Sequence, residues 1–252
     1  MFKGKRPVVF LDYDGTLTPI VERPEDAQLD AEVRQTLKEL AQHCTVAVIS
    51  GRDLPDVQKL VDLTNIYYAG SHGFDIAGPE GKRLVHQSGA EFLPVLDKAE
   101  KALTSRLEDK VPGSQIERKK FSIAVHYRRV AEGKVGEVED AMDQVLAEHT
   151  ELRKATGKKI FELQPDIDWH KGKALLWLLE KMALDHANVL PLYIGDDVTD
   201  EDAFEVLEDK GLGLVVQEGR APTRARYQLR NPAEVEQFLK SLIPVCKEND
   251  DE

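Results

Sequence analysis

The chain has 252 residues, of which 34 are Lys or Arg and 46 are Asp or Glu, so its formal net charge is −12. This acidic balance argues against a general nucleic-acid binder and against binding to anionic membranes, because both require clustered Lys and Arg. The apolar runs are too short to span a membrane, the N-terminus lacks a signal-peptide pattern, and there are only two cysteines, so we expect a cytoplasmic protein.

Short apolar runs alternate with amphipathic segments in the first third of the chain. The sequence predicts strands at residues 8–11, 45–49 and 66–69, and helices at residues 31–42 and 53–60. Continuous apolar strands separated by helices are typical of a parallel sheet that is covered on both faces. We therefore expect an α/β core to begin here.

The middle of the chain has a different pattern. Helices are predicted at residues 91–107 and 134–149, and the strands at residues 121–127 and 159–163 alternate between apolar and polar side chains. Alternation indicates a sheet with one exposed face. The middle third is therefore predicted to be an α+β insertion.

The last third returns to the first pattern. A helix at residues 173–184 precedes predicted strands at residues 190–194 and 212–216. Thr199 is predicted to cap the helix that follows the first of these strands, with Asp202 at the third helical position.

The final helix should begin at Asn231-Pro232, which places a capping side chain before a proline at the first helical position. Together these patterns predict an α/β fold with a discontinuous core domain, residues 1–86 and 166–252. An α+β cap domain is inserted at residues 87–165.

Two carboxylates follow the first predicted strand. Asp12 and Asp14 lie two positions apart on a turn, and Gly15 allows a close approach of the backbone. Ligands of open parallel sheets bind beyond the carboxyl ends of the strands, so one carboxylate can face a metal and the other a reacting group. An ordinary Asp-rich turn is the alternative at this position.

A second acidic group follows the strand at residues 190–194. Five acidic residues lie within the seven positions from Asp196 to Asp202, and they repel one another unless a cation compensates. Mg²⁺ prefers hard oxygen ligands of this kind. The preference of carboxylates for helix N-termini explains Asp200 to Asp202, but it does not explain Asp196 and Asp197.

Two further segments favour binding of an anion at the same sheet edge. Ser50, Gly51 and Arg52 follow a predicted strand and precede a helix, so they offer a hydroxyl, a backbone amide and a positive helix end. Lys171 and Lys173 open a helix, where cations oppose the helix dipole and so require another reason to be present. A solvated lysine pair is the alternative at this position.

These segments are similar to conserved motifs of a known family. The chain resembles the trehalose-6-phosphate phosphatases of the haloacid dehalogenase superfamily, and the resemblance covers nearly its whole length. The matching motifs are Asp-Tyr-Asp-Gly-Thr-Leu-Thr-Pro-Ile (12–20), Ser-Gly-Arg (50–52), Tyr-Ala-Gly-Ser-His-Gly (68–73), Val-His-Tyr-Arg (125–128), Lys-Gly-Lys-Ala-Leu (171–175) and Gly-Asp-Asp-Val-Thr-Asp-Glu-Asp-Ala-Phe (195–204). The resemblance implies a Rossmann-like hydrolase core with a cap that covers the site and binds the sugar.

The resemblance also implies catalytic roles. Asp12 is expected to be the nucleophile that forms an aspartyl phosphate, and Asp14 the acid and base that serves the leaving group and then water. Ser50 and Lys171 are expected to bind the transferring phosphoryl group. Lys173 is the alternative to Lys171, which we prefer because the family pattern places the lysine before the glycine.

By the same resemblance, Mg²⁺ is the expected cofactor. Its ligands are expected to be the Asp12 carboxylate, the Asp14 backbone carbonyl and Asp196. Asp197 and Asp200 are expected to complete or orient that ligand set.

The alternating strand in the middle third presents a small and polar face. Lys120, Ser122, His126 and Arg128 share this face, whereas Glu117 and Lys119 have the wrong parity for one flat strand and require a bend or turn before Lys120. A plain solvated sheet surface is the alternative. The substrate-binding residues implied by the resemblance are Gly51, Arg52, His72, Glu117, Lys119, Lys120, His126, Arg128 and Glu162.

The expected activity is Mg²⁺-dependent hydrolysis of trehalose 6-phosphate. The expected partner is therefore a small sugar phosphate, without nucleic acid or membrane, and the expected state is a monomer. Alternatives are a phosphatase for another ester such as sucrose phosphate or mannosylglycerate phosphate, and a non-catalytic sugar-phosphate sensor, which would not need both Asp12 and Asp14. A dinucleotide-binding domain would need a glycine-rich loop after the first strand, and residues 12–15 do not form one.

Overall fold

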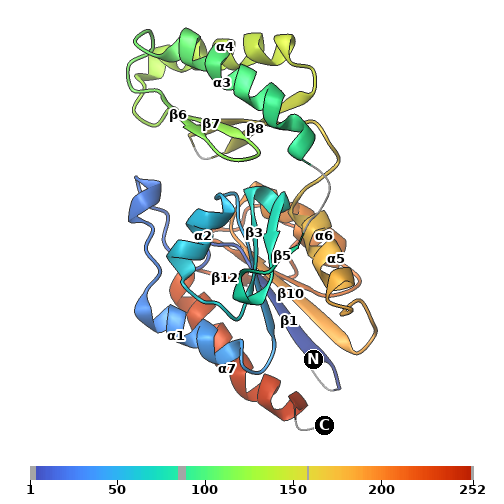
Figure 1. Ribbon diagram of the computed structural model, residues 1–252. Helices are drawn as coiled ribbons and strands as arrows, with labels where there is room; N and C mark the ends of the chain where they lie inside the picture. The colour runs from blue at the N-terminus through green and yellow to red at the C-terminus, as the bar shows by residue number, and fades with distance from the viewer. Residues whose placement is uncertain (1–3, 85–88, 158, 251–252) are drawn as a thin grey trace. The chain divides into compact units, whose positions relative to one another are not determined.

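Figure 1 shows a computed structural model, which describes residues 4–84, 89–157 and 159–250. The chain forms two compact units: unit 1 comprises Met1–Val85 and Trp169–Glu252, and unit 2 comprises His86–Asp168. The predicted domain boundary at 86/87 lies outside the described residues. The predicted boundary at 165/166 precedes the observed change of unit after Asp168.

Unit 1 is built on an eight-stranded sheet in the order β12-β11-β10-β1-β2-β3-β4-β5. The strands from β12 to β3 pair in parallel, as predicted, and β4 and β5 are added antiparallel at one edge. The short strands β4, β5 and β12 were not predicted, because two or three residues carry no periodicity. The bounds are β1 Arg6–Leu11, β2 Thr45–Ile49, β3 Tyr67–Gly70, β4 Asp75–Ala77, β5 Arg83–Leu84, β10 Val189–Gly195, β11 Leu212–Val216 and β12 Tyr227–Leu229.

Helices cover both faces of this sheet. Val9 and Leu11 of β1 pack in one apolar cluster with α1, α2 and α7, whereas Val8 and Phe10 pack in a second cluster with α5 and α6. Successive side chains of a strand point to opposite faces, so both sets must be apolar and the strand becomes a continuous apolar run. The helix bounds are α1 Ala31–Leu40, α2 Leu54–Val61, α5 Lys171–Lys181, α6 Glu201–Leu207 and α7 Pro232–Asp250.

Unit 2 is an α+β structure with an antiparallel sheet in the order β6-β7-β9-β8. Ile123 and Val125 of β7 point into an apolar cluster that also contains residues of α3 and α4, so the helices cover one face only. This arrangement explains the alternating sequence pattern. The bounds are α3 Leu93–Leu107, β6 Gln115–Arg118, β7 Ile123–His126, α4 Val135–Glu148, β8 Leu152–Gly157 and β9 Ile160–Pro165.

Short 3-10 helices complete the structure, and one of them corrects a predicted cap. Thr199 does not cap α6; instead Asp197 caps the 3-10 helix η6 (Val198–Asp200), where it accepts a hydrogen bond from the Val198 amide at 2.7 Å. The tight turn precedes α6, so the capping residue lies further upstream than a simple α-helix would place it. The predicted cap of α7 is confirmed, since Asn231 Oδ1 accepts from the Glu234 amide at 3.0 Å. The remaining 3-10 helices are η1 Pro24–Asp26, η2 Ser71–Gly73, η3 Pro79–Gly81, η4 Ala90–Phe92 and η5 Glu132–Lys134.

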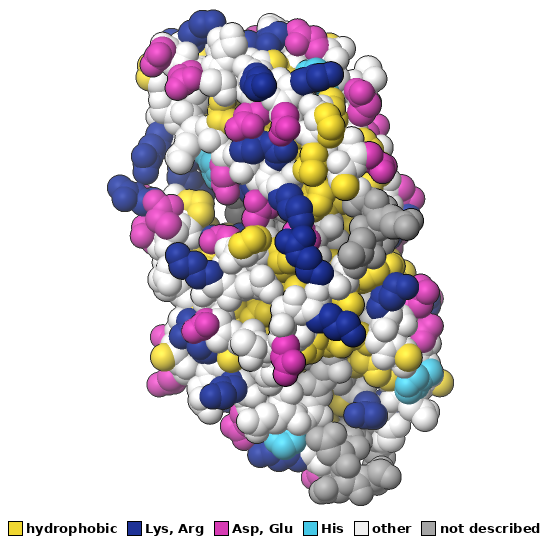
Figure 2. All heavy atoms as spheres, in the orientation of Figure 1, with side chains coloured by type: hydrophobic (Ala, Val, Ile, Leu, Met, Phe, Trp, Pro, Cys, Tyr) yellow, Lys and Arg dark blue, Asp and Glu magenta, His cyan; other side chains and the backbone are white. Residues whose placement is uncertain are grey.

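Acidic side chains are not segregated from basic ones on the surface drawn in Figure 2, where the two kinds are interspersed. Among the described residues, no helix is both long enough and apolar enough to cross a membrane.

Candidate active site

The strand order of unit 1 brings the predicted motifs to one edge of the sheet. Asp12 follows β1, Ser50 follows β2 and Asp196 follows β10, and β1 pairs in parallel with both neighbours. The carboxyl ends of these strands therefore lie side by side, although their residues are far apart in the sequence.

A buried lysine joins two of the predicted carboxylates. Lys171 is the first residue of α5, and its Nζ lies 2.8 Å from Asp12 Oδ1 and 2.7 Å from Asp200 Oδ1. The lysine side chain is only 3% exposed. Lys173, two residues further along the same helix, is half-buried. The geometry thus favours Lys171 over Lys173 as the cation beside the candidate nucleophile.

Asp200 is fixed on both of its oxygens. Oδ1 accepts from Lys171 and from the Tyr193 hydroxyl, the latter at 2.6 Å. Oδ2 accepts from the backbone amides of Asp196 and Asp197, each at 2.9 Å. These contacts fit the orienting role among the two roles predicted for Asp200.

The three carboxylates of this cluster lie close enough together to share one cation. Carboxylate oxygens of Asp12, Asp196 and Asp200 lie within 4.8 Å of one another, and Lys171 is the cation that contacts two of them. Burial raises the pKa of Asp12 well above its usual range, against the opposing effect of Lys171, and the charges of Asp200 and Asp196 raise it further. Burial tends to lower the pKa of Lys171, but Asp12 and Asp200 raise it above its usual value. Hard oxygen donors with surplus negative charge fit a divalent cation such as Mg²⁺.

Asp196 and Asp197 are placed differently from each other. Asp196 lies against Gly15: a Cβ atom on Gly15, whose φ is +82°, would come within 2.2 Å of Asp196 Oδ2. The glycine therefore admits the carboxylate next to the loop that holds Asp12. Asp197 instead uses its side chain to cap η6.

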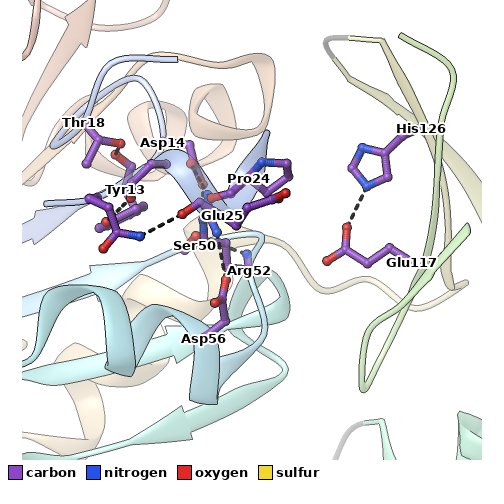
Figure 3. Close-up of polar contacts among 12 residues, drawn as sticks. Tyr13, Asp14, Thr18, Pro24, Glu25, Ser50, Arg52, Asp56, Glu117 and His126 are labelled. Atoms are coloured by element: carbon purple, nitrogen blue, oxygen red, sulfur yellow. Dashed lines mark hydrogen bonds and ion pairs between the residues drawn. The ribbon is translucent and has the colours of Figure 1, made fainter. Parts of the chain in front are cut away.

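Asp14 does not join the Asp12 cluster in this structure. Its two oxygens accept hydrogen bonds from Arg52, at 2.7 Å from Nε and 2.8 Å from Nη2, as Figure 3 shows. Arg52 also contacts Asp56 at 2.8 Å. Arg52, expected from sequence to bind substrate, is thus engaged with protein groups.

The predicted anion cradle is tightly built. Ser50 is buried, and its Oγ accepts from the Arg52 amide at 3.1 Å. The imidazole of His72 packs over Gly51, where an added Cβ would lie 2.8 Å from the ring. Ser71 and His72 both have a positive φ, 49° and 56°, which is strained for residues other than glycine. Such strain is stored preferentially at functional sites.

A turn joins β6 and β7, as the positions of Glu117 and Lys119 in the sequence pattern required. β6 and β7 form a hairpin in which Glu117 lies opposite Ala124, and Ala124 lies opposite Glu162 on β9. Directly opposed residues share a face of the sheet. The hairpin therefore places Glu117 and Lys119 on the same face as Ser122 and His126.

Two hydrogen-bonded groups occupy this face. His126 Nε2 lies 2.6 Å from Glu117 Oε2, and the contact lowers the pKa of Glu117 despite its partial burial. Glu162 accepts from Ser122 at 2.6 Å, Lys119 at 3.1 Å and Gln164 at 3.0 Å.

The other two predicted residues of unit 2 lie outside the strands. The Lys120 ammonium is in the hairpin turn, 4.9 Å from the centre of the Phe121 ring. Arg128 follows β7 and is exposed. Their roles remain predictions.

Comparison with known proteins identifies the family. The trehalose-phosphatase family model matches residues 10–233. The chain belongs to this family. Probable trehalose-phosphate phosphatase D of Arabidopsis thaliana is 44% identical over 96% of this chain and 68% of its own length.

Solved structures agree with this assignment. The C-terminal domain of trehalose-6-phosphate phosphatase from C. albicans is 25% identical and has a TM-score of 0.83, covering 97% of this chain and 96% of its own. A haloacid dehalogenase-like hydrolase from Bacteroides thetaiotaomicron, 15% identical, shows the same fold with a TM-score of 0.67, covering 94% and 100% of the two chains. This member of the trehalose-phosphatase family is therefore a phosphatase with the haloacid dehalogenase fold.

Sequence reasoning missed two polar residues of this phosphatase. Tyr193 lies inside an apolar strand, so nothing in the sequence pattern separates it from the core residues around it. Gln164 is two positions from Glu162 in the same strand, so the two side chains share a face of the sheet. That spacing was the signal that could have identified Gln164.

Proposed function

We propose that this phosphatase hydrolyses trehalose 6-phosphate to trehalose and phosphate, with Mg²⁺, through a phosphoryl group held covalently on Asp12. The observation that carries the proposal is the buried contact of Asp12 with Lys171 in a chain that belongs to the trehalose-phosphatase family. The names of the relatives supply the substrate, and the buried carboxylate supplies the nucleophile.

The proposed reaction has two steps. In the first, an Asp12 oxygen bonds to phosphorus, the bond from phosphorus to the sugar oxygen breaks, and Asp14 gives that oxygen a proton. In the second, water attacks the same phosphorus, Asp14 takes a proton from the water, and the bond to Asp12 breaks. Lys171 and Ser50 are proposed to stabilise the negative charge of the phosphoryl group in both steps.

Residues present in the site fit the proposed cofactor. Asp12, Asp196 and the Asp14 carbonyl are the proposed ligands of Mg²⁺, and Asp200 orients the loop that carries Asp196. When bound, Mg²⁺ supplies neutralisation of charge on the phosphoryl oxygens. Asp197 is proposed to act by holding η6 rather than by direct contact.

Unit 2 is the proposed specificity domain. Its polar face combines carboxylates, cationic and amide groups and a hydroxyl, which suit recognition of sugar hydroxyls. We propose that Glu117, Lys119, His126 and Glu162 bind the sugar. Cytoplasm remains the proposed location, supported by the low cysteine content of two residues.

The test is phosphate release from a panel of sugar phosphates with and without Mg²⁺. Trehalose 6-phosphate should give the highest kcat/KM; an equal or higher value for sucrose phosphate or mannosylglycerate phosphate would overturn the substrate assignment. Asp12→Asn should abolish turnover and retain substrate binding. Asp30→Asn is the matched control, since Asp30 caps α1 and asparagine caps helices equally well. Normal turnover by Asp12→Asn would refute the nucleophile.

A further inference from the structure

Arg52 occupies a more elaborate position than a substrate ligand needs. The residue follows β2, and its side chain is only 10% exposed. It donates to both oxygens of Asp14, to Asp56 at 2.8 Å and to the Pro24 carbonyl at 2.7 Å, and it lies over the Tyr13 ring at 5.4 Å. Figure 3 shows Asp14 and Asp56 on either side of the guanidinium group.

The contacts of Arg52 form two sets: those that hold the guanidinium group in place (the anchor), and those by which it binds Asp14. The guanidinium group is held by Asp56, the Pro24 carbonyl and the Tyr13 ring. These three groups take no part in the proposed reaction. The paired hydrogen bonds to Asp14 are of the parallel, bidentate kind, which fixes the plane of a carboxylate as well as its position. Arg52 can therefore stay in place whatever happens at Asp14.

Asp14 remains open to water while it is held. Its side chain is 42% exposed, and each carboxylate oxygen has a second lone pair that a bidentate arginine leaves available. A carboxylate that is held in one orientation and open to solvent is arranged to meet a water molecule. Water is the reactant of the second proposed step, so the arrangement suits that step.

We infer that Arg52 is a positioning residue for the hydrolytic step: it holds the Asp14 carboxylate where it accepts a proton from the attacking water. In that step the water oxygen bonds to phosphorus, the bond from phosphorus to Asp12 breaks, and the proton passes to Asp14. The inference rests on the proposed function, and it replaces the direct substrate contact that the sequence predicted for Arg52.

The test uses Arg52→Lys in the full-length protein, with the phosphate ester that wild type hydrolyses fastest. Lysine keeps the charge but cannot hold both oxygens of a carboxylate in one plane. A general base contributes about 10²–10⁴-fold to a rate, so a loosely held one should lower kcat roughly 10–100-fold. Because the second step becomes limiting, KM should fall together with kcat, and acid-quenched samples should show phosphorylated Asp12 by mass spectrometry.

Three variants complete the experiment. Asp56→Asn loosens only the anchor and should give the same signature more weakly. Arg34→Lys is the matched control, because Arg34 also donates through Nε and Nη2, to the Val61 and Leu60 carbonyls, away from the site; its kcat and KM should stay near wild type. Asp14→Asn is assayed with p-nitrophenyl phosphate, whose leaving group needs no proton in the first step, and it should accumulate phosphorylated Asp12 strongly. Thermal melting checks the folding of each variant.

The outcomes separate the inference from the proposed function. An increase in KM for Arg52→Lys, or a loss of kcat without phosphorylated Asp12, overturns the role of Arg52, provided that Asp14→Asn accumulates the phosphorylated form. If neither variant accumulates it, the proposed Asp12 mechanism itself fails. If Arg52→Lys has a lowered melting temperature, the role of Arg52 is tested with Asp56→Asn instead. Asp56→Asn should lower KM if Arg52 positions Asp14, and it should raise KM if Arg52 binds the substrate directly.

Discussion

Asp200→Asn should destabilise the protein and inactivate it at the same time. The wild-type carboxylate accepts from Lys171 and Tyr193 on one oxygen and from two backbone amides on the other. An asparagine side chain of the same shape has a single acceptor oxygen and a donor NH₂ group. Whichever way the amide turns, its NH₂ group meets donors on one side.

The magnitude follows from these contacts. Removing one partner of a buried ion pair costs about 3–5 kcal/mol, and Lys171 keeps Asp12 at 2.8 Å, so we expect the lower value, about 3 kcal/mol. In a chain of this size 1 kcal/mol corresponds to roughly 2–4 °C, so the melting temperature should fall by about 6–12 °C. A displacement of the Lys171 ammonium of about 1 Å should lower kcat on the order of 100-fold.

Urea unfolding and steady-state kinetics measure the two effects. Asp202→Asn is the control, because Asp202 is 47% exposed and its contact with His170 is 3.7 Å long. The control should change the free energy of unfolding by less than about 0.5 kcal/mol. If Asp200→Asn lowers the free energy of unfolding by less than about 1 kcal/mol and retains kcat, the view that the four hydrogen bonds hold the site together is refuted.

Three further predictions concern the proposed metal site and the core. Gly15→Ala should raise the Mg²⁺ concentration that gives half-maximal activity, because its Cβ would lie 2.2 Å from Asp196 Oδ2; Gly219→Ala, with nothing within 4 Å, should not. Chelation should abolish phosphate release reversibly and leave the circular dichroism spectrum unchanged, since Lys171 and backbone amides also hold the carboxylates; irreversible unfolding would contradict this. Burial raises the pKa of Tyr68 to about 12, from about 10 in an unfolded chain, so its stabilising effect is complete below pH of about 10 and is lost as the pH rises through about 12. In alkaline urea titrations, Tyr68→Phe should lose less stability over that range than wild type does.

The sequence was most informative where a pattern extended over several residues. The apolar runs of β2 and β11 predicted both strands at their observed bounds, because buried parallel strands leave no polar position inside. The spacing of motifs at strand ends predicted that Asp12, Ser50 and Asp196 would meet at one edge. Strand order decides such meetings, and parallel α/β topology leaves few choices.

Side-chain contacts between residues that are far apart in the sequence could not be predicted. Nothing near Asp14 in the chain indicates that Arg52 holds it, because the hydrogen bonds join residues 38 positions apart. The hairpin turn between β6 and β7 was required by parity but could not be located by it. Thr199 was a reasonable cap by residue type, and the 3-10 turn at η6 displaced the cap to Asp197.

The interrupted course of unit 1 has a consequence for synthesis on the ribosome. β1 lies between β2 and β10, so one of its two neighbours is encoded after the whole of unit 2. Until residues 189–195 emerge, the nascent chain carries β1 with one apolar edge unpaired, and Asp200, which contacts Lys171 beside Asp12, is synthesised later still. The contiguous unit 2 is complete earlier, so the cluster of Asp12, Asp196 and Asp200 is assembled only after unit 2 has been synthesised. A product that stops before β10 would contain Asp12 and Lys171 without Asp196 and Asp200, and it would expose a strand edge that favours aggregation.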